Sequence, residues 1–126
     1  WLPKIISASF DVLVESGYSP IVAWFVCYYE VKSIIDLFHE DGFEFLNNSI
    51  SNIAEYGGAT RGDFLIDDSV KIKMKKMIKQ IQSGDFVKEW DNEQQKKLTL
   101  KSNRKKIKSS NIEKMNKKML KILFKK

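Results

Sequence analysis

One long segment, from residue 20 to residue 41, is apolar around more than one face of a helix. Ser19 and Pro20 supply an N-cap and a first helical residue that needs no hydrogen-bonded N–H, and Gly42 supplies a stop. Apolar side chains recur between them at three- and four-residue steps: Ile21, Trp24, Phe25, Tyr28, Val31, Ile34, Ile35 and Phe38. A helix with so wide an apolar surface is predicted to be the most buried element of the fold.

The remaining apolar residues also repeat with helical spacing, and no alternating stretch of useful length predicts a strand. Further helices are predicted at 4–16, 49–56, 69–83, 85–95 and from Ile112 to Leu123. We expect the helix at 49–56 to end at Gly57 and Gly58, and Asp68 to cap the helix after it. Residues 42–48 and 64–66 are predicted to be connections. The fold class is therefore all-α.

Composition limits the class of protein. The 126 residues, 43% of them apolar, fit one ordinary folded domain. Cys27 is the single cysteine and can form no internal disulfide. The longest apolar run, Ile21 to Tyr29, is far shorter than the roughly 20 residues of a membrane helix. We expect a cytoplasmic protein without a membrane partner, and because Trp1 opens the chain without a signal-peptide pattern, we expect a fragment.

Charge is divided unevenly along the chain. Residues 1–69 carry three Lys or Arg against eleven Asp or Glu, a net charge of −8, whereas residues 70–126 carry nineteen against five, a net charge of +14. A basic tail can bind a polyanion by counterion release, but only Arg61 and Arg104 are arginines, the side chain suited to bidentate phosphate recognition. We expect a solvated Lys-rich tail rather than a nucleic-acid site.

Glu30 is the acidic residue whose surroundings are most unusual. Its helical neighbours are Val26, Cys27, Ser33 and Ile34, so no lysine on the same helix can pair with it. A carboxylate in apolar surroundings must find a partner or become neutral. Two partners are open: a distant lysine, or a divalent cation such as Mg²⁺.

The segment Ser49 to Asn52 places two hydroxyls and an amide at a predicted helix start. Such groups are commonly capping residues. The same position, with free N–H groups and the positive end of the helix dipole, also suits an anionic or polar substrate. His39 and Cys27 have no partners at ligand or catalytic spacing, so we assign neither to a site.

Several stretches, taken together, resemble one enzyme family over roughly residues 8–95. They are Leu13 to Pro20, Tyr29 to Leu37, Ser49 to Gly57, Ile81 to Phe86 and Lys88 to Trp90. They are similar to the C-terminal domain of the short, bacterial-type ketol-acid reductoisomerases. The resemblance implies a helical bundle whose chain is knotted or entwined with that of a second subunit, and therefore a homodimer or higher homo-oligomer.

The resemblance also implies an activity for the complete enzyme. The family isomerises a 2-acetohydroxy acid of the 2-acetolactate class with the help of Mg²⁺ and reduces it with NADPH, in the biosynthesis of valine, leucine and isoleucine. The cofactor lies in an N-terminal Rossmann domain. No glycine-rich dinucleotide motif is present in this sequence, so the NADPH site is not in this chain.

Two site residues carry over from the family. Glu30 matches the second of two glutamates that bind one Mg²⁺, and Ser51 matches a serine that contacts the substrate. The first glutamate of the pair lies one helical turn earlier, where this chain has Val26. A one-turn spacing lets two carboxylates share a cation, and valine offers no oxygen.

The resulting prediction is a knotted-type helical domain at 1–95, incomplete at its N-terminal edge, and a Lys-rich helical tail at 96–126. We predict that it belongs to a ketol-acid reductoisomerase and is inactive alone. The alternative prediction is a non-catalytic helical interaction module whose basic tail binds a polyanion.

Overall fold

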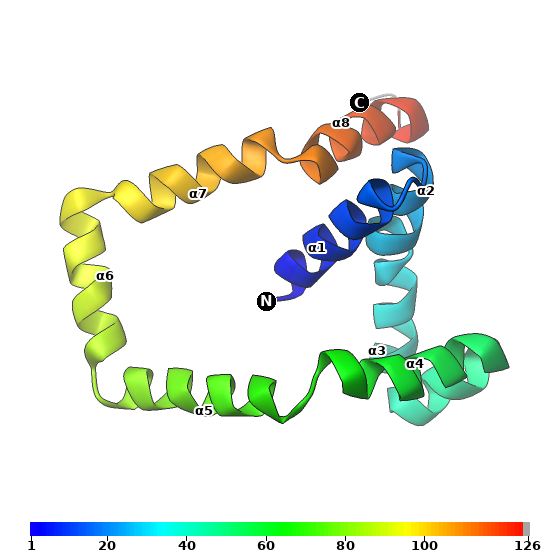
Figure 1. Cartoon of the computed structure of the whole chain (residues 1–126), viewed down its shortest axis with the longest axis horizontal. Coiled ribbons are helices and arrows are strands. Elements are labelled where there is room, and N and C mark those ends of the chain that lie inside the picture. Colours follow the sequence, from blue (N-terminus) through cyan, green and yellow to red (C-terminus); the bar gives the residue numbers. More distant parts are fainter. Residues whose placement is uncertain (125–126) are drawn as a thin grey trace. The chain divides into compact units, whose positions relative to one another are not determined.

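The structure is a computed structural model that describes residues 1–124, and these residues form helices and no strand. The all-α prediction is confirmed. The helices are α1 (Leu2–Glu15), α2 (Pro20–Trp24), the π-helical turn η1 (Phe25–Tyr29), α3 (Val31–Ser49), α4 (Asn52–Leu65), α5 (Asp68–Gln82), α6 (Asp85–Lys96), α7 (Leu98–Ser109) and α8 (Asn111–Phe124) (Figure 1). They group into two compact units: Trp1–Leu46 with Asn103–Lys126, and Asn47–Ser102.

The first unit has a small apolar core where α1, α2 and α8 meet (Figure 1). Phe10 of α1, Ala23 and Trp24 of α2 and Met119 of α8 are buried there. Half-buried residues surround these four: Leu13, Val14, Phe25, Cys27, Ile112 and Met115. The core therefore joins two segments from opposite ends of the sequence, each through the apolar stripe that its helical spacing predicts.

The predicted helix at 20–41 is correct in extent but differs in form. It starts at Pro20, changes to π-helical geometry at Phe25–Tyr29, and continues as α3. Asp41 and Gly42 have non-helical backbone angles, with φ of +82° at Gly42, so the helix breaks at the predicted stop, and helical structure then resumes up to Ser49. The prediction of a connection at 42–48 is therefore wrong.

The segment is also less buried than predicted. Ala23 and Trp24 are buried, but no residue of η1 or α3 is. The wide apolar surface that predicted the most buried element of the fold is covered by this chain only at α2.

The second unit consists of α4, α5, α6 and the start of α7, and none of the residues 47–102 is buried. Its helices are defined by local signals. Asp67 caps α5 by accepting a hydrogen bond of 3.0 Å from the Ser69 backbone N–H, and a hydrogen bond from the Ser69 hydroxyl lowers the pKa of Asp67. Gly84 turns the chain from α5 to α6 with φ of +79°.

Three predictions in this unit are wrong. The helix that follows Ser51 does not stop at Gly57 and Gly58 but runs through both to Leu65. The predicted connection at 64–66 is therefore mostly helix. Asp67, not Asp68, is the cap of α5. The two adjacent glycines keep negative φ angles, so their weak helix propensity is overridden by the helix around them.

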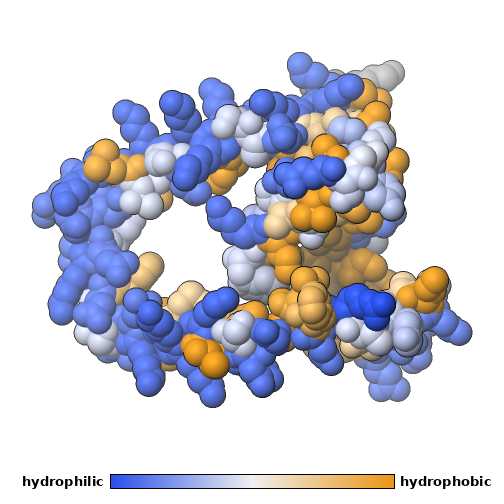
Figure 2. Space-filling view, in the orientation of Figure 1, coloured by the Kyte–Doolittle hydropathy of each residue, from blue (hydrophilic) through white to orange (hydrophobic). Residues whose placement is uncertain are grey.

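Apolar side chains remain at the surface of the second unit. On α5, Met74, Met77, Ile78 and Ile81 are 44–59% exposed. Together with half-buried Val70 they form one stripe, here called the α5 stripe. Figure 2 shows hydrophobic residues among the hydrophilic ones along this helix.

No helix within residues 1–124 is long and apolar enough to cross a membrane.

Candidate functional site

Glu30 lies directly after the π-helical turn. Its backbone N–H donates a 3.0 Å hydrogen bond to the carbonyl of Phe25, five residues back, and its own carbonyl accepts one of 3.2 Å from Ile34. π-Helical turns are rare and are frequent at functional sites. The turn thus marks the same position that the sequence singles out by its carboxylate.

An aromatic cluster packs within the turn. The ring of Trp24 lies 5.1 Å from that of Phe25, 5.6 Å from Tyr28 and 5.2 Å from Tyr29, measured between centroids. Phe25 and Tyr29 also meet edge to face at 5.4 Å. Contacts of this kind add to the stability of buried apolar surface. These ring contacts tie the turn to the core residue Trp24. Val26 and Glu30 lie in and directly after this turn.

Val26 and Glu30 line the same cavity, of about 370 Å³. Trp1, the N-cap of α1, and Leu2, its first residue, contribute to the wall. The other lining residues are apolar side chains of α3: Val31, Ile34, Ile35 and Phe38. Glu30 is the one charged residue among those that line it. The cavity is an apolar groove with a single carboxylate.

The residues that line the cavity with Glu30 are apolar, as expected, but Glu30 itself is solvent-exposed, so the expected desolvation of its carboxylate is not found in this chain. Glu30 is flanked by apolar residues in the sequence, but its side chain lies on a side of the helix that this chain leaves open to water. A hydrated carboxylate needs neither a lysine partner nor neutralisation. Its role as a metal ligand stays a prediction.

Ser51 is the N-cap of α4. Its hydroxyl accepts a hydrogen bond from the Ala54 backbone N–H at 3.4 Å, a long distance for such a bond. The capping interpretation is therefore confirmed, and the substrate contact stays a prediction. Ser51 belongs to the second unit and Glu30 to the first.

The sequence assigns neither Cys27 nor His39 to a site. Cys27 is half-buried against the core, and burial raises the pKa of its thiol. A raised pKa disfavours the reactive thiolate. His39 is exposed on α3, and within residues 1–124 no group of three or more His, Cys, Asp or Glu side chains is placed to hold a metal ion.

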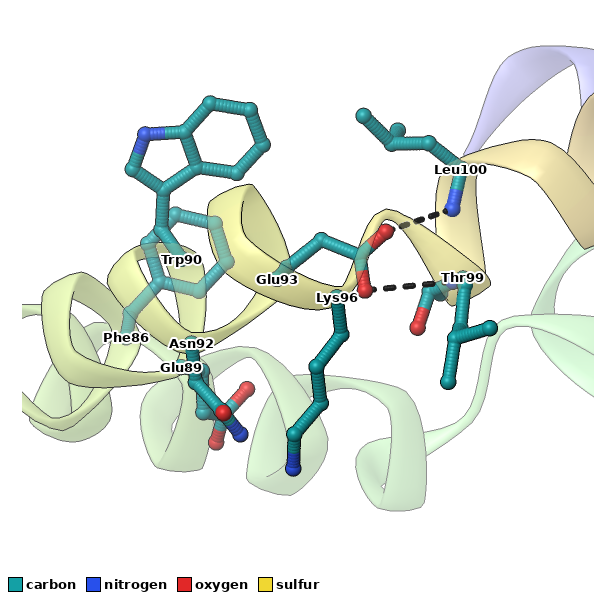
Figure 3. A pocket seen from close by; sticks show the side chains of 9 residues that line it. Phe86, Glu89, Trp90, Asn92, Glu93, Lys96, Thr99 and Leu100 are labelled. Atoms are coloured by element: carbon teal, nitrogen blue, oxygen red, sulfur yellow. Dashed lines mark hydrogen bonds between the residues drawn. The ribbon is translucent and has the colours of Figure 1, made fainter.

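One polar interaction was not expected from the sequence. The carboxylate of Glu93 on α6 accepts hydrogen bonds from the backbone N–H groups of Leu100 and Thr99 on α7 (Figure 3). These bonds hold the pKa of Glu93 below its usual range. No helix-start signal in the sequence reveals this cap, because its acceptor lies on the preceding helix.

Comparison with known proteins extends the similarity over the whole described chain. The family described as the C-terminal domain of ketol-acid reductoisomerase matches residues 1–124. A solved structure of an NADH-preferring ketol-acid reductoisomerase from an uncultured archean is similar, with a TM-score of 0.93 and 36% sequence identity. The match covers 99% of this chain and 38% of that one, so the chain spans less than half the length of its relative. The chain belongs to the ketol-acid reductoisomerase C-terminal domain family.

Proposed function

We propose that this chain acts as the helical domain of an enzyme that isomerises and reduces 2-acetohydroxy acids, one step in the biosynthesis of branched-chain amino acids. The observation that carries the proposal is the family match along residues 1–124, together with the 0.93 TM-score at 36% identity. At this identity the similarity goes beyond a shared helical architecture.

The proposal needs residues that this chain does not supply. A dinucleotide site requires a strand, a glycine-rich turn and a helix, and the described residues contain no strand. We therefore expect the 126 residues to be inactive alone and to require an N-terminal cofactor domain. The cofactor we propose is a nicotinamide dinucleotide. The resemblance favours NADPH, whereas the similar solved enzyme is named for its preference for NADH.

The experiment fuses this chain to the cofactor domain of a related reductoisomerase and measures oxidation of NADPH and of NADH with 2-acetolactate present. Substrate-dependent oxidation is expected of the fusion that carries Val26→Glu, and of neither part alone. A fusion that binds cofactor and is folded but does not turn over, even after the substitution at Val26 described below, would contradict the proposed activity.

We also propose a homodimer or higher homo-oligomer, entwined through these helices. The support is the α5 stripe and the absence of any buried residue in 47–102. A helical unit without a core of its own needs a second surface to bury its apolar side chains. The family resemblance implies that a second copy provides it. Sedimentation velocity at tens of micromolar should show a dimer or larger species.

For the site residues, we propose that Ser51 contacts the substrate and that Glu30 offers one carboxylate oxygen donor at the metal site. Ser51 is exposed at the start of α4, where N–H groups and the helix dipole favour a substrate carboxylate. Glu30 is exposed after the π-helical turn. Both positions are open to a ligand.

A further inference from the structure

We infer that the helix face of Val26 and Glu30 does not form a divalent-cation site from its own side chains, because Val26 removes the second oxygen donor. The inference rests on the proposed function for the identity of the metal, Mg²⁺. It concerns residues of this chain alone, and it can be tested without turnover.

The geometry of the turn puts both residues on one face. Val26 is the second residue of the π-helical turn and Glu30 follows its last residue, so the two lie about one turn apart. Both line the same 370 Å³ cavity. A carboxylate at position 26 would therefore lie beside that of Glu30, and the valine presents methyl groups there instead.

The remaining wall offers no replacement ligand. Apart from Glu30, the cavity is lined by side chains without a carboxylate, hydroxyl or amide: Leu2, Val31, Ile34, Ile35, Phe38 and the indole of Trp1. The next carboxylate along the same helix, Asp36, forms an ion pair with Lys32 and is not among the lining residues.

Magnesium chemistry explains why this face is a weak site. Mg²⁺ keeps several waters in its octahedral shell and is bound through one or two carboxylates, with other oxygens such as those of a substrate completing the shell. A single exposed carboxylate in high dielectric attracts it weakly. Glu30 alone is then no better a ligand than the other exposed acidic side chains of this chain. The residues present do not fit a specific magnesium site, and the family's two-carboxylate arrangement is broken at position 26.

The substitution that restores the donor should be tolerated. Val26 is 50% exposed and is not part of the buried core, so Val26→Glu removes little buried apolar surface. Val26→Gln is the matched control, since it has nearly the same size and an oxygen acceptor but no charge. Circular dichroism establishes that each variant keeps its helices.

The experiment titrates Mn²⁺, as a probe for Mg²⁺, into the full 126-residue chain and follows free Mn²⁺ by electron paramagnetic resonance. We expect the wild-type chain and Glu30→Gln to bind equally weakly. Val26→Glu should bind at least ten times more tightly, which corresponds to about 1.4 kcal/mol. Val26→Gln should not gain, and Val26→Glu combined with Glu30→Gln should lose the gain.

Two results would overturn the inference. One is a wild-type chain that binds one Mn²⁺ tightly and loses that binding on Glu30→Gln. The other is a folded Val26→Glu chain with no gain in affinity. Turnover of the fused enzyme is a separate readout: a Val26→Glu fusion that gains the metal but does not react would contradict the proposed function and leave this inference standing.

Discussion

Glu93 caps a helix other than its own: its carboxylate accepts a 2.9 Å hydrogen bond from the backbone N–H of Leu100, seven residues later. A second bond of 3.1 Å comes from Thr99. Between the two helices Lys97 adopts a left-handed conformation with φ of +52°, which is uncommon for a residue with a side chain. The cap and the turn together fix the corner between α6 and α7.

Replacing Glu93 with Gln should lower the melting temperature, because the charge that strengthens both hydrogen bonds is lost. The folded-state pKa of Glu93 is depressed. Its stabilising effect is therefore complete above the unfolded pKa of about 4.3 and is lost as the pH falls through the folded value. Thermal melts of both proteins should differ at pH 7 and converge in acid.

Glu89→Gln is the control for this experiment, since it removes a charge one turn earlier on the same helix. The difference in melting temperature between Glu89→Gln and the wild type should not shrink to a comparable degree as the pH falls. Equal behaviour of the two variants at every pH would mean that the bonds to Thr99 and Leu100 do not stabilise the chain.

Two substitutions at Ser51 separate its capping role from the proposed substrate contact. Ser51→Ala removes the cap and should reduce the free energy of unfolding by about 0.5–1 kcal/mol. Ser51→Asp keeps a capping oxygen and should be close to wild type in stability. In the fused enzyme, both should reduce kcat/KM with 2-acetolactate. Wild-type activity of Ser51→Asp would leave Ser51 with the capping role only.

Alanine substitutions at two glycines should have opposite effects on stability, because Gly58 lies inside α4 and Gly84 lies at a turn with positive φ. Gly58 lies inside α4 with no atom within 4 Å of an added Cβ, so Gly58→Ala should stabilise the chain by about 0.5–1 kcal/mol. Gly84 has φ of +79°, and Gly84→Ala should destabilise it by about 1–2 kcal/mol. Urea unfolding measures both. A loss of stability in Gly58→Ala would contradict an uninterrupted helix.

A charge placed in the α5 stripe tests the proposed oligomer. Ile78 is 53% exposed in the single chain, so Ile78→Lys should scarcely disturb an isolated protomer but should disrupt an interface that buries the stripe. The expected result is a shift toward monomer in sedimentation velocity. Ile72→Lys makes the same substitution at a 66% exposed position on the opposite face of α5 and should leave the assembly intact.

Helical periodicity predicted the all-α class and the positions of α1, α5, α6 and α8, because each has an apolar stripe, and α1 and α5 are also followed by a glycine stop signal. It misplaced the end of α4, where two adjacent glycines resemble a stop but the residues on both sides continue the helix. It also overestimated burial from residue 25 onward. Apolar side chains predict that a surface will be covered, but they do not identify the chain that covers it.

The site could be predicted in part. A lone carboxylate on an apolar segment pointed to Glu30, and the family resemblance pointed to the missing partner at position 26. Exposure of Glu30 could not be predicted, because it depends on which side of the segment packs against α1 and α8. The cap by Glu93 depends on the path of the chain at Lys97 and has no local sequence signature.

The π-helical turn at Phe25–Tyr29 has a consequence for how the long segment can evolve. It amounts to one residue inserted into an α-helix, which rotates everything after it by about 100° relative to α2. Deleting one residue within the turn would give a regular helix but would bring a different set of side chains to the groove in place of Glu30 and Ile34. A point substitution at the groove therefore leaves the other lining residues in place, whereas a change in length there does not.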